Sequence, residues 1–357
     1  MILSAYHWEQ IVRSTKGIFG HISRATGVDI GTSLMKTVVL QEDRNGFSLA
    51  DFSLQSVCKT NNPDEQSYTC LVESLREKIE IPFGTIGTSL SGASVFVKSM
   101  ILPTMTEKDL RKHLNLELDR YIACNVEDVY WDVYCPIPCS LVQAEQQEYV
   151  LVVAKKECVE RRVEAFRQDG MTLRFVDVDA FALVNLVVHN YGREGTWVLA
   201  HSGPTGMVMV VIVEGEPVGI RKIPYDAEWY GEFFENMFIT KTSLEQRKPR
   251  KNLEPSEALL LEKFGQEIHE RICESWESFS DRVPRGMNRR ILLSGGYAVA
   301  PGITSMVAQC VGDEVELLDP FQSITIPIRI QQDLCFQYAA PLMGVAVGMA
   351  LRGAGHD

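Results

Sequence analysis

Hydrophobic residues follow two kinds of pattern along this chain, and the two kinds alternate. Short apolar runs that lead into turns predict buried strands, for example at 27–30, 150–154 and 291–293. Apolar residues spaced three and four positions apart predict helices, of which the clearest covers 260–279. The chain is therefore expected to combine strands and helices in an α/β fold.

A tight turn joins two predicted strands within 27–40. Gly31 can adopt a backbone conformation that other residues resist, and Thr32 and Ser33 add hydroxyl and N–H groups. Consecutive N–H groups in such a turn form a concave anion site, and Asp29 stands where Mg²⁺ would take a ligand through water. Two interpretations stay open: a phosphate-and-metal turn for a nucleotide, or an ordinary hairpin with an aspartate near its turn.

A second notable turn follows the buried strand at 291–293 and reads Ser294-Gly295-Gly296-Tyr297. Pro301 soon afterwards opens a predicted helix. Two adjacent glycines leave the backbone open, so a flat base or a ribose can lie directly on it. An early Asp-x-Gly-Thr and a late Ser-Gly-Gly, each after a strand, resemble the arrangement of the actin-like ATPases, in which two similar domains close on a nucleotide.

Composition and charge narrow the class of protein. A chain of 357 residues that is 45% hydrophobic predicts two or three domains, and a net charge of -12 argues against a nucleic-acid partner. Nine dispersed cysteines without a C-x-x-C pair fit reduced thiols in a cytosol rather than a zinc site. No apolar run reaches the about 18 residues of a membrane span, and the first 15 residues lack the pattern of a secretory signal.

The N-terminal arm, residues 1–26, carries a basic amphipathic pattern inside an acidic protein. Trp8, Ile11, Phe19 and Ile22 share one predicted helical face, and basic residues accompany it. Such a helix can lie on a membrane surface, dock on a partner or pack on the protein's own sheet. The sequence leaves these alternatives open.

Two longer segments carry a more specific resemblance. The segments SLSGASVFVKSMILPTMTEKDLRKHLNLELDRYI at 89–122 and VDVDAFALV at 176–184 are similar to the PilM family of type IV pilus inner-membrane platforms. The cell-division protein FtsA is a more distant relative of that family. The resemblance covers about 27–353 and implies an actin-like ATPase fold with two domains around a nucleotide cleft and an FtsA/PilM-type inserted subdomain.

The resemblance also implies a domain order. After the arm, we expect the first actin-like domain at 27–84 and 166–195, interrupted by the inserted subdomain at 85–165. The second actin-like domain is expected at 196–335, and a C-terminal helix within 336–357 is expected to return to the first domain. Gly344 and Gly348 lie one turn apart in this helix, which predicts close packing on a sheet.

The cofactors implied by the resemblance are ATP and Mg²⁺, with Asp29 as the metal-site residue. A looser match to the family helix that approaches the ribose and base adds Glu245 and Lys248, which a solvated charge run would equally explain. The nucleotide contacts expected within the two domains are Asp29, Gly31, Thr32, Ser33, Lys36, Ser202, Gly203, Thr205, Gly295, Gly296 and Tyr297.

His201 is a departure from the family pattern. The turn after Trp197–Ala200 normally carries Asp-x-Gly, and here His201 takes the place of the acid. A histidine cannot replace a carboxylate as a ligand for the hard, strongly hydrated Mg²⁺. Hydrolysis is therefore not expected, since one part of metal-assisted attack is missing. The resemblance still implies that the nucleotide binds. Alternatively, His201 caps a strand in a degenerate site.

The function implied by the resemblance is that of a type IV pilus assembly platform protein. It would be a cytoplasmic adaptor, peripheral at the inner membrane, that captures the N-terminal peptide of a PilN-like membrane protein. Other platform proteins, the motor ATPase and self-association are further candidate contacts. The alternatives are an active or filament-forming actin-like ATPase, a small-molecule kinase of the same fold, and a nucleotide-free pseudo-actin scaffold of a type II secretion-like system.

Overall fold

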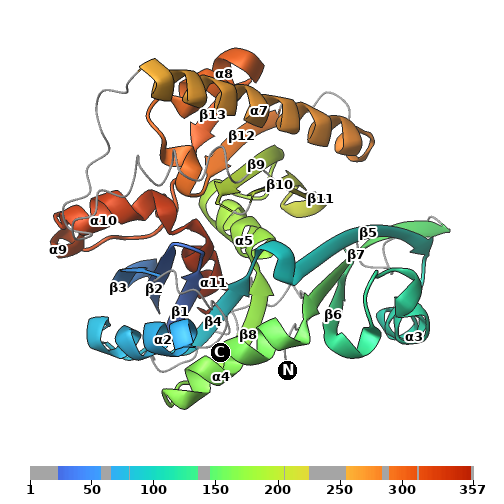
Figure 1. Cartoon of the computed structure of the whole chain (residues 1–357), viewed down its shortest axis with the longest axis horizontal. Helices are drawn as coiled ribbons and strands as arrows, with labels where there is room; N and C mark the ends of the chain where they lie inside the picture. The colour runs from blue at the N-terminus through green and yellow to red at the C-terminus, as the bar shows by residue number, and fades with distance from the viewer. Residues whose placement is uncertain are drawn as a thin grey trace.

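The computed structural model describes residues 23–57, 66–79, 81–135, 145–204, 206–224, 255–283, 289–311 and 313–354. Figure 1 shows the second domain, with α7 (Pro255–Phe279) and α8 (Ile303–Val311), above the first, and the inserted subdomain extending to one side. The arm up to residue 22, together with Thr205, Glu245 and Lys248, lies outside the described residues. The first strand begins at Ser23, so positions 23–26 belong to a sheet and not to the arm.

The first domain is built on a five-stranded sheet with the order β3-β2-β1-β4-β8. β1 and β2 are antiparallel, as are β2 and β3, whereas β1, β4 and β8 run parallel to one another. Gly46, with a φ of +114°, closes the hairpin between β2 and β3. The strands are β1 (Ser23–Ile30), β2 (Leu34–Asp43), β3 (Gly46–Ser56), β4 (Thr85–Leu90) and β8 (Leu173–Val178).

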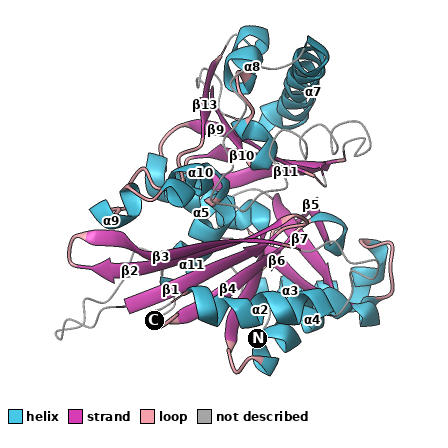
Figure 2. Cartoon of the chain, turned by 60° about the vertical axis from the view of Figure 1, so that its left-hand side comes forward, coloured by secondary structure: helices cyan, strands magenta, loops and turns pink. Residues whose placement is uncertain are grey.

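The second domain repeats this plan with a five-stranded sheet of order β11-β10-β9-β12-β13. A turn at 214–215 joins β10 to β11, with Glu214 at a φ of +51°. α7 (Pro255–Phe279) and α8 (Ile303–Val311) cover one face of this sheet (Figure 2). The strands are β9 (Thr196–Gly203), β10 (Gly206–Val213), β11 (Glu216–Ile223), β12 (Arg289–Ser294) and β13 (Glu314–Leu317).

Two helices connect the domains through one shared core. α5 (Asp179–Tyr191) and α11 (Gly344–Ala354) pack with apolar residues of both five-stranded sheets, including Leu40 and Leu199. The other face of the first sheet packs against α2 (Gln66–Lys78) and α4 (Lys156–Gln168). One core of apolar residues therefore joins the two sheets.

α11 packs closely on the first sheet, as predicted, but its Gly348 faces α5. A Cβ atom at Gly348 would stand 1.9 Å from Ala182 O on that helix. The sheet approaches α11 through Gly27, where a Cβ atom would stand 1.9 Å from Ala346 O. Small residues on both helices and on β1 let the three backbones meet.

The inserted subdomain has its own three-stranded sheet with the order β5-β7-β6. It contains β5 (Val95–Pro103), β6 (Val129–Tyr134) and β7 (Gln146–Lys155), with α3 (Glu107–Glu117) packed on one face. Residues 85–90, which we assigned to the insertion, form β4 inside the first sheet. The separate sheet therefore starts at Val95, because β4 pairs in parallel with β1 and β8.

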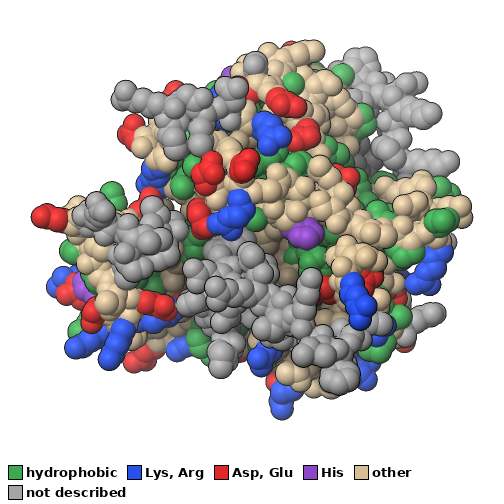
Figure 3. Space-filling model, turned by 180° about the vertical axis from the view of Figure 1, so that it is seen from behind, with side chains coloured by type: hydrophobic (Ala, Val, Ile, Leu, Met, Phe, Trp, Pro, Cys, Tyr) green, Lys and Arg blue, Asp and Glu red, His purple; other side chains and the backbone are tan. Residues whose placement is uncertain are grey.

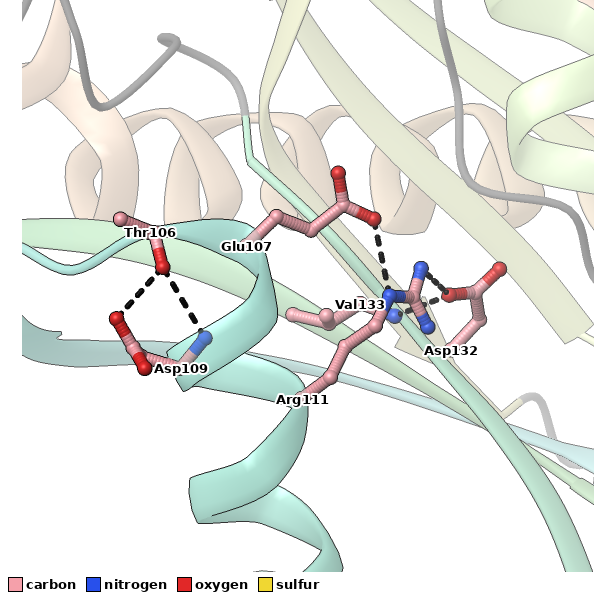
Figure 4. A network of polar contacts seen from close by, with 6 residues as sticks. All are labelled: Thr106, Glu107, Asp109, Arg111, Asp132 and Val133. Carbon is pink, nitrogen blue, oxygen red and sulfur yellow. Dashed lines mark hydrogen bonds and ion pairs between the residues drawn. The ribbon is translucent and has the colours of Figure 1, made fainter.

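Polar contacts hold α3 onto this sheet (Figure 4). Thr106 is the N-cap of α3, and its hydroxyl accepts a hydrogen bond from Asp109 N at 3.2 Å. Arg111 donates to Glu107 Oε1 at 2.9 Å and to Asp132 Oδ1 on β6 at 2.7 Å. The Arg111 guanidinium thereby joins the helix to the sheet.

Short elements complete the described chain, and the segment near Thr325 extends the first sheet by pairing with Ser48 at its β3 edge. Figure 3 shows the opposite side of the molecule, where acidic and basic side chains are interspersed. The short helical elements are η1 (Gly92–Ser94), η2 (Leu118–Arg120), η3 (Val126–Asp128), η6 (Ser280–Arg282), η7 (Gly296–Val299), α9 (Ile328–Gln331), α10 (Leu334–Ala339) and η8 (Ala340–Leu342).

Candidate functional site

A cavity of about 690 Å³ lies between the two domains, where strand ends of both sheets meet. In the first sheet, β1, β4 and β8 are parallel, so their carboxyl ends share one edge of the sheet. In the second sheet, β9 and β12 are parallel and likewise end together. Carboxyl ends of parallel strands are the usual place for ligands in α/β folds.

The cavity brings together ten of the eleven nucleotide contacts predicted within the two domains. They come from the β1–β2 turn, from the β9–β10 turn and from the start of η7, three segments far apart in the sequence. Thr205, the eleventh, is outside the described residues, as are Glu245 and Lys248. The ten that line the cavity are Asp29, Gly31, Thr32, Ser33, Lys36, Ser202, Gly203, Gly295, Gly296 and Tyr297.

The β1–β2 turn places a carboxylate and an ammonium group side by side. Gly31 N donates to Leu34 O at 3.0 Å and closes the turn. Asp29 and Lys36 face each other in the β1–β2 ladder, and Lys36 Nζ donates to Asp29 Oδ2. The turn therefore presents N–H groups, hydroxyls and one ion pair to the cavity.

Asp179 is a cavity residue that the sequence analysis did not select. It is the first residue of α5, directly after β8, and its side chain is buried. Burial, and next the negative charge of Asp29, raise the pKa of Asp179 to about 7, while a hydrogen bond from Ser89 opposes the rise. Its Oδ1 has no hydrogen-bond partner among the described residues. Asp179 lies within the segment 176–184 that carries the family resemblance, and that segment was the sequence signal that could have located it.

Lys222 is the second functional residue that sequence reasoning missed. It projects from β11 into the cavity wall, and its Nζ donates to Gly92 O at 2.9 Å and Val95 O at 2.8 Å. Burial lowers the pKa of Lys222, and the nearby Asp179 carboxylate opposes that shift. No local sequence motif marks this position, because its role depends on the approach of the inserted subdomain.

His201 lies at the end of β9 and also lines the cavity. Its Nδ1 shares a hydrogen bond of 3.2 Å with Ser294 Oγ on β12. Burial lowers the pKa of His201 to about 4, with a smaller opposing contribution from Asp29. The imidazole is therefore neutral near pH 7, and it offers a nitrogen where the family pattern has a carboxylate.

The paired glycines have different structural roles. Gly295 has a φ of +89°, and a Cβ atom there would stand 2.2 Å from Ser202 O. Gly295 therefore lets the β12 turn pack on the β9 turn. A Cβ atom at Gly296 would meet no atom within 4 Å, so this residue borders open space.

Two similar domains, each with a five-stranded sheet, that close on this cavity define the actin-like ATPase fold. The family model of type IV pilus assembly protein PilM matches residues 27–354, so the chain belongs to this family. The resemblance read from 89–122 and 176–184 is thereby confirmed. The chain is accordingly a type IV pilus assembly platform protein.

Three solved structures resemble this chain to different degrees, and the first of them shares its fold. The chain is similar to a PilM–PilN type IV pilus biogenesis complex with a TM-score of 0.73 and 21% identity, over 92% of this chain and 98% of that one. The ethanolamine utilization protein EutJ of Carboxydothermus hydrogenoformans gives a TM-score of 0.49 and 13% identity, over 92% and 89% of the two chains. The cytoplasmic domain of Vibrio cholerae EpsL gives a TM-score of 0.39 and 13% identity, over 59% of this chain and 75% of that one.

Within the described residues, no single helix has the length and apolar composition needed to cross a membrane. The pair Leu334–Leu342 and Gly344–Ala354 satisfies the criterion together, with a bend of 80° between the two helices.

Asp179 and His201 give stability opposite dependences on pH. Since the native pKa of Asp179 is raised to about 7, its contribution to the free energy of unfolding falls as pH rises from about 4 to 7. Since the native pKa of His201 is lowered to about 4, its contribution rises with pH up to about 6.5. In the wild type, the two effects offset each other over most of this range.

Replacing His201 by asparagine removes one of the two opposing effects. We expect the loss of stability relative to wild type to be larger at pH 6.5 than at pH 4.5, by at most about 1.4 kcal/mol per pH unit. Urea unfolding of both proteins at the two pH values measures this difference. A wild-type-to-variant difference that stays constant with pH would show that the His201 pKa is not lowered.

Proposed function

We propose that the protein is a nucleotide-holding adaptor of the pilus assembly platform. It binds ATP with Mg²⁺ between its domains without appreciable hydrolysis, and it captures the N-terminal peptide of a PilN-like membrane protein. The observation that carries the nucleotide part is the cavity itself, in which the Asp29–Ser33 turn, Ser202, Gly203 and the Gly295–Gly296 turn converge.

The residues of the cavity divide into phosphate contacts and base contacts. N–H and hydroxyl groups of Gly31, Thr32 and Ser33 suit phosphate oxygens, and Lys36 adds a positive charge at the same end. The open backbone at Gly296 supports a base or ribose lying flat against it. A ligand that contacts both ends would hold the two domains together, which is how it would favour a closed state.

The residues present fit a Mg²⁺ ion that arrives with the nucleotide. Among the described residues, no cluster of three His, Cys, Asp or Glu residues forms a cage for a metal. Mg²⁺ in nucleotide sites needs fewer protein ligands, one or two carboxylates with phosphates and water. Asp29 and the unpartnered Oδ1 of Asp179 provide those carboxylates. When bound, the ion would neutralise phosphate charge and orient the phosphates.

Neutral His201 supports binding without turnover. The ring supplies neither negative charge nor an oxygen ligand at the second phosphate turn. Organised attack of water on a γ-phosphate would therefore lack one of its usual acidic groups. The nucleotide then serves as a structural ligand whose occupancy sets the domain arrangement.

The partner proposal rests on the similarity to a solved PilM–PilN complex, with a TM-score of 0.73. β5 is an edge strand of the inserted sheet, and it exposes Phe96 by 47% and Ile101 by 68%. An edge strand with exposed apolar side chains suits the capture of an extended peptide. Such a contact would hold the protein at the inner membrane through its partner. Other platform proteins and the motor ATPase could then contact it there.

The experiment that tests the nucleotide part is calorimetry of the full chain with ATP, with and without Mg²⁺. We expect Mg²⁺-dependent binding that Asp29→Ala weakens at least tenfold, and phosphate release at background level. Asp119→Ala, an exposed carboxylate of the inserted subdomain, is the matched control and should bind as wild type. Lack of binding by the wild type would leave a nucleotide-free scaffold, and sustained phosphate release would identify an ATPase.

The partner part has its own test, because nucleotide and peptide binding are separate properties. The synthetic N-terminal peptide of a PilN from the same genome is titrated into the purified chain. Measurable saturable binding is the expected result. A flat titration with a protein that does bind ATP would contradict the adaptor proposal while leaving the nucleotide site in place.

A further inference from the structure

Polar contacts join the second domain to the inserted subdomain at three described places. Lys222 Nζ on β11 donates to Gly92 O at 2.9 Å and Val95 O at 2.8 Å. Arg282 forms an ion pair of 2.6 Å with Glu148 on β7, and the Tyr134 hydroxyl on β6 donates to a Glu216 carboxylate oxygen on β11. Of these residues, the described cavity wall includes only Lys222 and Gly92. One of the three contacts is therefore also part of the nucleotide cavity.

We propose that Lys222 couples nucleotide occupancy to the inserted subdomain. An ammonium group has three N–H donors, and the described carbonyl acceptors take two of them. The third is available to a phosphate oxygen in the cavity that Lys222 lines. With all three donors engaged, the ammonium group holds the nucleotide, the second domain and the start of the inserted sheet in one unit.

The direction of the coupling follows from charge. Lys222 Nζ already donates to two carbonyl groups of the inserted subdomain. A phosphate oxygen beside it would accept a charge-assisted hydrogen bond, which is about twice as strong as a neutral one, and would fix the position of the ammonium group. Nucleotide binding should therefore strengthen the bonds to Gly92 and Val95.

The contact reaches the part of the insertion that would meet a peptide. Gly92 begins η1 and Val95 begins β5, the exposed edge strand. The Val95 amide also donates to Gly92 O, so that both groups held by Lys222 belong to one short turn. Because coupling between two binding sites is reciprocal, a peptide that prefers the fixed edge strand would raise nucleotide affinity by the same factor.

This inference rests on the proposed nucleotide binding, and amide hydrogen exchange of the full chain can separate the two. The exchange is followed with and without ATP and Mg²⁺ in wild type, Lys222→Met and Glu148→Gln. In the wild type, ATP should slow exchange at 29–36 and 294–299, and at 92–103 by at least fivefold. Lys222→Met should keep the first two effects and lose the third.

Glu148→Gln is the matched control, because it removes an ion pair across the same interface that does not touch the cavity. It should respond to ATP as wild type does at all three segments. Thermal unfolding checks that each variant is folded, and Lys222→Gln, with a neutral donor, replaces Lys222→Met if the latter unfolds.

One outcome would contradict nucleotide binding, and another would contradict the coupling through Lys222 alone. No protection at 29–36 and 294–299 in the wild type would overturn nucleotide binding, and the coupling with it. Protection at those segments, with the response at 92–103 absent in the wild type or unchanged in the Lys222 variant, would overturn the coupling alone.

Discussion

Replacing Gly296 by valine should abolish nucleotide binding, with a loss of affinity of at least about 100-fold, or about 2.7 kcal/mol. A Cβ atom at Gly296 meets no protein atom within 4 Å, and the residue lines the cavity. The branched side chain would therefore occupy the space in which a base or ribose is proposed to lie. Because no packed atom has to move, the free energy of unfolding should change by less than about 1 kcal/mol.

The neighbouring glycine provides the contrast. Gly295→Ala places a Cβ atom 2.2 Å from Ser202 O at a φ of +89°, so this smaller change should destabilise the fold. Calorimetry with ATP and urea unfolding of both variants separate the two effects. Wild-type affinity in Gly296→Val would exclude this part of the cavity as the base or ribose site.

Replacing Arg352 by methionine should cost about 3–5 kcal/mol of the free energy of unfolding. Arg352 on α11 forms an ion pair with Asp177 on β8, and the two side chains are only 7% and 4% exposed. The guanidinium carbon also lies 4.9 Å from the centroid of the Phe175 ring. The variant would leave the Asp177 carboxylate buried beside the C-terminal helix without its cation.

Two further variants test this explanation of the Arg352 effect. Arg120→Met removes a surface pair with Glu117 whose arginine is 70% exposed, so it should cost less than about 1 kcal/mol. The double variant Arg352→Met, Asp177→Asn should recover part of the loss, because no unpaired charge is then buried. Urea unfolding measures all three. A loss below about 1 kcal/mol for Arg352→Met would show that the pair does not anchor α11.

Several residues of the cavity between the domains could be predicted from the sequence, because they lie in turns, which are local features. Gly31 follows a buried strand in a short hairpin, and Gly295 and Gly296 follow a second buried strand. Spacing and residue type were therefore sufficient to select these three glycines. All three line the cavity. The family motif at 89–122 supplied the fold, which the PilM family match over 27–354 confirms.

Residues whose role depends on another part of the chain were not predictable in this way. Lys222 lies in an alternating strand like many surface lysines, and only the approach of Gly92, 130 positions away, makes it a cavity residue. The start of the inserted sheet was misplaced for the same reason. The sequence of the segment 85–90 does not indicate which sheet it joins, and only its pairing with β1 and β8 assigns it to the first sheet.

The sequence by itself determined the strands, helices and glycine turns, together with the substitution of His201 for an acid, because these depend on residues a few positions apart. The tertiary structure decided which charged groups act on one another. It placed Asp179 beside Asp29 and buried its carboxyl group, which raises the pKa of Asp179 to about 7. It also gave Lys222 contacts with the inserted subdomain. Burial and the distance between charges are properties of the packed chain, so no reading of local pattern contains them.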